Sequence, residues 1–437
     1  MIAGILLGMI SVSLPLLVHQ VALSRALRAS TLCVLLVHQA ASVLHIILNG
    51  LPTMKMDPFA FHRFAQLGYG RLDAEPYAHF LHAIYRSFGS SHLLGCQVSN
   101  LFFSFALIIQ IKLLYRIGCE RVAPVLTILF GLPLSCVFNT SVTLREAAQM
   151  ALFLSLAYVL LLLAQEGASL LTLSIAPTFL GLHYLHHGFT AALALILPFA
   201  LAWAMKARPV VLVGLLMVSL SGSFFFLENA VERLSEESTA FNQVVSGNFD
   251  YVESYAQKVE EGRTDFGVNL DLSSPATIAK TGPLVLFYYL YSPLPWQIRG
   301  AMDIYGALEG LLRLTLTFFA LKAILNTTGR GRSDLILLAF IFIGMEVAWA
   351  AGTANWGTAF RHRLVAWGLL VALGGKGWSL WKPSKHSTSE GSEKVARMTE
   401  LSVRARRRAL TAKRQNREPT PKPRSKRRSP RSSFDSG

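Results

Sequence analysis

The stretch Thr353-Ala-Asn-Trp-Gly-Thr-Ala-Phe-Arg-His-Arg363 joins two long apolar runs, residues 334–351 and 364–381. Each run is long enough to cross the hydrocarbon core of a bilayer as a helix. The turn between them carries three adjacent basic residues, Arg361, His362 and Arg363. Because a charge close to hydrocarbon is costly unless it is paired, such a turn is predicted to hold an anion.

Apolar runs of the same kind recur along the whole chain. Apolar residues make up 52% of the sequence and charged residues only 15%, which is more apolar side chain than one soluble core needs. The runs predict an all-α, polytopic membrane protein with about eleven membrane-spanning helices. The predicted spans are residues 2–23, 30–51, 93–114, 122–138, 147–164, 168–183, 189–205, 209–227, 304–325, 334–351 and 364–381.

The charges of the connections predict the orientation of this body, residues 1–381. Cytoplasmic connections carry an excess of Lys and Arg. With the C-terminus in the cytoplasm, the short turns containing Arg25, Arg121, Lys206 and Arg330 share its side, and all are basic. The N-terminus is then outside. The predicted outer connections are residues 52–92, 139–146, 184–188, 228–303 and 352–363.

The longest outer connection, residues 228–303, is predicted to contain interfacial or re-entrant helices within 276–303. This part is rich in aromatic residues, including Tyr288, Tyr289 and Trp296, which are typical of headgroup depth. Trp296 offers a flat surface for a sugar ring, and the alternative is a headgroup anchor. If this piece spans the membrane instead, the orientation of everything before it inverts.

The C-terminal segment, residues 382–437, has a different composition. It holds seventeen Lys and Arg against five acids, so it accounts for twelve of the sixteen net positive charges. It is rich in Ser and Pro and almost free of aromatic residues, so it cannot bury enough surface to fold by itself. We expect a disordered, cytoplasmic tail that meets anionic membrane lipids rather than nucleic acid.

Acidic and basic residues lie close together in the first outer connection, at Asp57, His62 and Arg63. A carboxylate here could deprotonate an acceptor hydroxyl, while His62 and Arg63 could hold a phosphate. The alternative is a solvated loop with a Pro turn and an amphipathic helix.

A second candidate patch is Thr143-Leu-Arg145-Glu146, at the start of the fifth span. Thr143 and Glu146 have the spacing of a capping box, which predicts Thr143 as the N-cap. The positive charge of Arg145 is unfavourable at a helix N-terminus unless an anion or an acid compensates it. Arg145 therefore binds either a substrate phosphate or a structural carboxylate.

Histidines gather at His183-x-x-His186-His187. This pattern matches one box of the di-iron membrane desaturases, but those enzymes need several boxes. Hydrogen bonding of His186 to a substrate, or packing at the membrane interface, is the favoured interpretation over a metal centre.

The turn at 353–363 fits a diphosphate, because two guanidinium groups can bind phosphate oxygens bidentately. Asn355 lies in the same turn, and His362 could protonate or orient a leaving phosphate. The alternative is a pair of arginines that reach the headgroup layer as anchors, although such anchors are expected on the inner side.

Four patches, residues 57–63, 143–146, 292–296 and 355–363, resemble those of bacterial membrane proteins of surface-polysaccharide assembly. The chain is similar to O-antigen and exopolysaccharide polymerases, and more distantly to C-type glycosyltransferases. The resemblance implies a glycosyltransferase that uses polyprenyl phosphate- or polyprenyl diphosphate-linked sugars at the outer face of the inner membrane. In the C-type enzymes the key acid follows the first helix, whereas Asp57 follows the second predicted span.

Carried over by position, the resemblance implies Arg145, Arg361 and Arg363 as phosphate ligands beside Arg63, and Asp57 as the base, with His62 and His362 assisting. The sugar is expected to contact Trp296, Asn355, Glu146 and His186. No metal or cofactor is expected, because arginines can stabilise the departing phosphate. The expected partners are a polyprenyl-linked oligosaccharide and chain-length or export proteins. Two alternatives stay open: a transporter or flippase for an anionic glycolipid, and a non-catalytic glycan-assembly partner.

Overall fold

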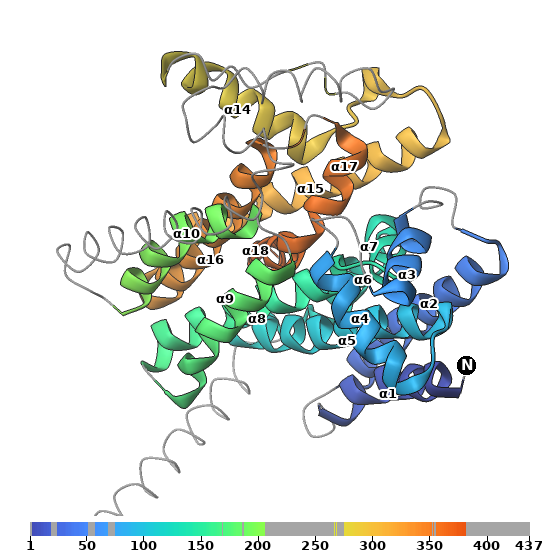
Figure 1. The fold of residues 1–437 in the computed structure, drawn as a ribbon. Coiled ribbons are helices and arrows are strands. Elements are labelled where there is room, and N and C mark those ends of the chain that lie inside the picture. The colour runs from blue at the N-terminus through green and yellow to red at the C-terminus, as the bar shows by residue number, and fades with distance from the viewer. Residues whose placement is uncertain are drawn as a thin grey trace, which may run out of the picture. The chain divides into compact units, whose positions relative to one another are not determined.

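The computed structural model describes residues 2–18, 24–50, 57–68, 75–167, 169–185, 188–205, 266, 268, 275–351, 353 and 355–381. The regular secondary structure of these described residues is helical throughout (Figure 1), as the sequence predicts. The predicted span 209–227, residue His186 and the basic tail lie outside the described residues.

Five of the described helices are long and apolar enough to cross a membrane. They are α2 (Arg25–Ile47), α5 (His92–Arg116), α8 (Glu146–Glu166), α16 (Gly329–Ala351) and α18 (Leu364–Trp381). This number and this composition indicate a multi-span helical membrane protein. The remaining described helices and 3-10 turns are α1 (Ile2–Val18), α3 (Asp57–Leu67), α4 (Glu75–Phe88), α6 (Ala123–Gly131), α7 (Leu134–Thr140), η1 (Leu170–Ser174), α9 (Ile175–Leu185), α10 (Gly188–Ala204), α14 (Pro275–Tyr291), η2 (Pro295–Gln297), α15 (Ala301–Asn326) and α17 (Trp356–His362).

Two predicted spans differ in form from the helices that the structure contains. Residues 122–138 were predicted as one span, but α6 and α7 meet at an angle of 62°. Pro133 lies between them, and proline cannot donate the backbone hydrogen bond that a continuous helix needs. The predicted span 168–183 is a 3-10 turn followed by α9, so only a short apolar helix remains there.

Contacts between helix ends show how the helices run. Gly4 faces Leu93 and Gly8 faces Gln97, so α1 runs parallel to α5. Arg116 forms an ion pair with Glu166, so α5 and α8 also end together. The N-terminal part of α16 reaches the same end, where Arg330 donates to the carbonyl oxygen of Ala164 (3.0 Å). At the opposite end, here called the site end, α5, α8 and α18 begin and α2 and α16 finish.

α3 and α4 lie at the site end and share a small apolar cluster with the bundle. On α3 the buried residues are Pro58, Phe61 and Ala65, which repeat at helical spacing on one face. Phe61 packs in a cluster with Tyr77 of α4 and Leu94 of α5. This apolar face fixes α3 over the start of α5 and thereby positions Asp57, its first residue.

α15 and α18 approach each other closely at two glycines of α18. A Cβ atom added at Gly377 would lie 1.8 Å from the carbonyl oxygen of Phe319, and one at Gly374 would lie 2.8 Å from that of Leu316. Small residues allow this approach, which is typical of helix pairs within membranes. The pairing holds α18, and with it the preceding helix α17, against the rest of the bundle.

Candidate functional site

Arg361 joins two carboxylates from distant parts of the chain. Its Nε and Nη2 atoms donate to Oε1 of Glu146, at 2.8 and 2.6 Å. Its Nη1 atom donates to Oδ2 of Asp57 at 2.5 Å. Three residues of the sequence prediction therefore meet in space, one each from α3, α8 and α17. We call Asp57, Arg145, Glu146, Arg361 and His362 the charged cluster.

Local helix electrostatics favour this arrangement. Asp57 and Glu146 each lie in the first turn of a helix, where the backbone dipole stabilises negative charge. Arg361 and His362 lie in the last turn of α17, where it stabilises positive charge. Asn355 begins α17 by accepting a hydrogen bond from the backbone N–H of Thr358 (2.8 Å). Asn355 therefore caps the helix that presents Arg361.

The predicted capping box at the start of α8 is wrong. α8 begins at Glu146, and Arg145 occupies the N-cap position without a side-chain hydrogen bond to the helix. The hydroxyl of Thr143 lies 3.6 Å from the sulfur of Cys96 instead. The carboxylate of Glu146 turns towards Arg361, so the stronger, charge-assisted partner replaces the backbone cap.

Arg145 is buried beside this ion pair. Its Nη1 atom donates to the carbonyl oxygen of Leu185 (3.3 Å), at the end of α9. Its guanidinium carbon lies 5.9 Å from the ring centroid of Phe61. The structure therefore places Arg145 between α3, α8 and α9, next to Glu146 in the chain.

His362 is held from two sides. Its Nδ1 atom lies 2.8 Å from the hydroxyl of Thr353, and its ring stacks on Trp349 with 4.1 Å between centroids. Burial, and then the charges of Arg361 and Arg145, lower the pKa of His362 to about 3. With this pKa the imidazole is neutral near pH 7 in the structure described.

His62 belongs to a neighbouring aromatic group rather than to the charged cluster itself. Its Nδ1 atom lies 2.8 Å from the hydroxyl of Tyr85, and its ring stacks on His92 with 4.8 Å between centroids. Burial lowers the pKa of His62. His45 also contacts His92, yet no group of His, Cys, Asp or Glu within the described ranges is arranged to hold a metal ion.

Arg363 points into the bundle, away from Arg361. It is fully buried, and its guanidinium donates to the carbonyl oxygens of Leu290 (2.9 Å) and Ser292 (3.3 Å). Its guanidinium carbon lies 4.9 Å from the ring centroid of Phe360. Arg363 therefore ties α17 to the end of α14, and the structure does not bring the two arginines of this turn together.

A second set of charges lies inside the bundle, and we call it the inner cluster. Glu309 accepts hydrogen bonds from the hydroxyls of Ser135 and Tyr305, both at 2.6 Å. The Nη2 atom of Arg313 lies 3.6 Å from Glu309, and its guanidinium carbon lies 4.7 Å from the ring centroid of Trp367. The i, i+4 spacing of Glu309 and Arg313 indicates such a pair.

Sequence reasoning missed Glu346, which interacts electrostatically with Arg313 of the inner cluster. Glu346 lies within α16 and is almost completely buried. Its signal was available, because Glu346 is the one acidic residue in the interior of the apolar run 334–351, whose other acid, Asp334, is its first residue. An ionisable residue within a span indicates a special role.

Three remaining predicted site residues are not part of the charged cluster as described. Arg63 is exposed on α3, and Trp296 is the middle residue of η2, where it is 71% exposed. His186 lies outside the described residues. The structure thus brings together Asp57, Arg145, Glu146, Arg361 and His362, whereas the guanidinium of Arg363 binds Leu290 and Ser292 instead.

These spans and buried charges define the class as a multi-span helical membrane protein. No protein-family model matches the chain, and neither a curated protein nor a solved structure matches it. The resemblance to polysaccharide-assembly proteins therefore rests on the four sequence patches alone.

Proposed function

We propose that the charged cluster binds the phosphate groups of a polyprenyl-linked sugar, and that the protein transfers this sugar to an acceptor glycan. The proposal is based on the hydrogen bonds of Arg361 to Glu146 and Asp57 at the site end. The protein would be a polymerase-like glycosyltransferase in the inner membrane of a bacterium.

The two carboxylates that bind Arg361 differ in exposure, and this supports replacement of the more exposed one by a phosphate. The side chain of Glu146 is 5% exposed, whereas that of Asp57 is 54% exposed. A phosphate oxygen would replace Asp57 at Nη1, while Nε and Nη2 keep Glu146. Arg145 adds a second positive charge nearby. The guanidinium groups then stabilise the negative charge that develops on the departing phosphate.

The released carboxylate of Asp57 would act as the base. It accepts the proton of the acceptor hydroxyl as that oxygen attacks the anomeric carbon, and the bond to the phosphate oxygen breaks. The neutral His362 and its partner Thr353 would orient the polar groups around the phosphate.

The orientation predicted from the sequence gives the side of the membrane on which the proposed reaction takes place. Eleven spans, with the basic turns in the cytoplasm, put the site end at the outer face. The short helices α1, α9 and α10, together with α15 and the bent pair α6–α7, would each cross the bilayer once. Lipid-linked sugars would then reach the charged cluster sideways from the outer leaflet.

The test uses purified protein in lipid vesicles with a polyprenyl diphosphate oligosaccharide, and it measures elongated product. We expect Arg361→Ala to lower the rate about 100-fold or more, as for loss of a donor that stabilises a transition state. Asp57→Asn should lower it by a similar factor, since a general base typically contributes about 10²- to 10⁴-fold. The matched control is Arg116→Ala, which removes an arginine–carboxylate pair at the other end of the bundle.

A transporter or flippase is the second candidate, and the inner cluster is the observation that favours it. Charged residues inside spans commonly mark a path for a polar substrate. Movement of the donor across the vesicle membrane without elongation, by protein that is correctly folded, would reject the transferase and support this candidate.

A further inference from the structure

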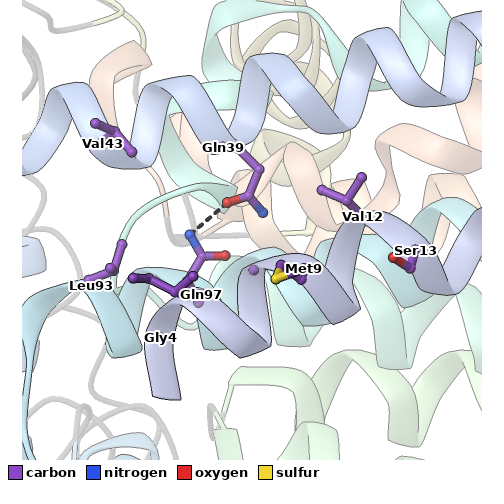
Figure 2. Close-up of a pocket in the computed structure, with 10 residues that line it drawn as sticks. Gly4, Met9, Val12, Ser13, Gln39, Val43, Leu93 and Gln97 are labelled. Carbon is purple, nitrogen blue, oxygen red and sulfur yellow. Dashed lines mark hydrogen bonds between the residues drawn. The ribbon is translucent and has the colours of Figure 1, made fainter. Parts of the chain in front are cut away.

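A groove of about 440 Å³ lies between α1, α2 and α5. Figure 2 shows Met9 of α1 and Val43 of α2 at its sides, and Gln39 of α2 joined to Gln97 of α5. The amide of Gln97 donates to Gln39 at 2.7 Å, and the amide of Gln39 donates to Ser11 at 2.9 Å. The side-chain amides of Gln39 and Gln97 therefore bind each other and Ser11, and apart from these two glutamines and Ser13 the lining is apolar.

Two glycines of α1 shape this groove. A Cβ atom at Gly4 would lie 3.1 Å from Leu93, and one at Gly8 would lie 3.0 Å from the amide of Gln97. α1 thus packs closely on α5 along this edge. Its neighbouring side chains point outward, with Met9 63% exposed, and Val43 of α2 is 46% exposed. The groove therefore opens on the face where the candidate span α2 meets lipid.

Its size favours a single hydrocarbon chain over a helix. An α-helix is about 10 Å wide and rises 1.5 Å per residue, so it fills roughly 120 Å³ per residue. The groove would hold fewer than about four residues of a helix, so a second copy of this chain does not fit inside it. Its volume does lie within the roughly 300–1,000 Å³ range of small-molecule sites.

One end of the groove lies below α3. Leu93 and Val43 mark this end, and Leu93 is adjacent to His92 in the chain. His92 packs against Phe59 of α3, with 4.5 Å between ring centroids. Phe59 is two residues from Asp57, which binds Arg361. A chain in this groove would thus have its head near the charged cluster.

We propose that this groove holds the polyprenyl chain of the lipid phosphate whose head binds the charged cluster, an inference that rests on the function proposed above. A polyprenyl phosphate carries one chain, which suits a single groove, whereas a bilayer phospholipid carries two. The lining on α1 runs from Gly4 to Ser13, about 14 Å at 1.5 Å per residue, so the apolar walls bind the part of the chain nearest its head. The closed Gln39–Gln97 pair presents no unpaired amide to it.

The test is photolabelling of the full-length protein in vesicles with a polyprenyl phosphate that carries a diazirine in its chain. We expect labelled peptides from α1, α2 or α5, and competition by unlabelled polyprenyl phosphate but not by phosphatidylglycerol. Met9→Trp and Val43→Trp fill the groove from exposed positions. Each should lower this labelling about tenfold, the factor expected for loss of roughly two buried methylene groups.

Adjacent residues provide matched controls. Ile10→Trp and Leu44→Trp add the same side chain at exposed positions that do not line the groove, and they should leave labelling unchanged. Labelling elsewhere, equal competition by phosphatidylglycerol, or labelling unaffected by Met9→Trp and Val43→Trp would overturn the proposal. Sugar transfer is measured separately: groove labelling without elongation by the wild-type protein rejects only the transferase, and elongation without groove labelling rejects only the groove.

Discussion

Arg361 binds two carboxylates that differ in burial, and this difference predicts unequal effects of removing them. Glu146→Gln leaves a largely buried guanidinium with one exposed partner. We expect it to lower the free energy of unfolding by up to about 3 kcal/mol, at the low end for a broken buried pair. Asp57→Asn removes an exposed partner and should cost no more than about 1 kcal/mol. Unfolding by denaturant in mixed micelles measures both.

The double variant Glu146→Gln/Asp57→Asn is the informative control. If both carboxylates act through Arg361, its effect will differ from the sum of the single effects, because contacting groups are not additive. Equal costs for the two single variants would contradict the burial argument.

At the residue scale the sequence identifies charged side chains that meet in the structure, but it does not predict where each one points. Asp57, Arg145, Glu146 and Arg361 are recognisable because each is a charge next to an apolar run. Arg361 and Arg363 are two positions apart on a short turn, and this spacing sends them in different directions. Their directions depend on where α17 ends, which is at His362, between the two arginines. A few residues of sequence do not determine the end of so short a helix.

At the scale of elements, the approach of α18 to α15 depends on glycine. Gly377→Ala puts a Cβ atom against the backbone of Phe319, which cannot move aside as a side chain can. Although alanine favours helix, we expect a net loss of about 1–3 kcal/mol in the free energy of unfolding, as in overpacked cores. The measurement is the same denaturant titration in micelles.

Gly331→Ala is the matched substitution on α16. Its added Cβ atom would meet only a methyl group of Thr327 at 3.2 Å, so helix propensity should dominate and stability should stay equal or rise. A loss at Gly331 as large as that at Gly377 would show that the backbone contact is not the cause.

The long helices could be predicted because hydrophobic length alone identifies them. The break between α6 and α7 was missed, although Pro133 indicates it, because the apolar run continues across the proline. The start of α8 was misplaced because a local capping pattern competed with a long-range ion pair. Local sequence carries no information on a partner 215 residues away.

At the scale of the whole molecule, the orientation can be tested directly. Ser90 is exposed between α4 and α5 at the site end, and Thr328 is exposed between α15 and α16 at the opposite end. If the site end is outside, a membrane-impermeant maleimide should label Ser90→Cys in intact cells, and it should label Thr328→Cys only after the cells are opened. The reverse pattern would place the charged cluster in the cytoplasm and end the proposed function.

The parent chain provides the background for this labelling. Cys96, Cys119 and Cys136 are buried, whereas Cys33 is exposed on the candidate span α2, so labelling is compared with that of the parent chain and of a Cys33→Ser variant. The sequence yields a prediction of the orientation because basic residues gather in short turns. It yields none for the depth of each helix in the bilayer, since helix tilt depends on packing against neighbours.

The hydrogen bonds that cross α1, α2 and α5 have a consequence for how the protein is made. Gln39 emerges from the ribosome well before Gln97, its partner on α5. The side-chain N–H of Gln39 reaches Ser11 of α1, but its carbonyl oxygen has to wait for Gln97. An unmatched carbonyl in hydrocarbon is costly, so with α1 and α2 as the proposed first two spans, this pair enters the bilayer with a defect that α5 repairs. Biogenesis must therefore shelter this early hairpin, at the insertion machinery or with bound water, until synthesis reaches residue 97.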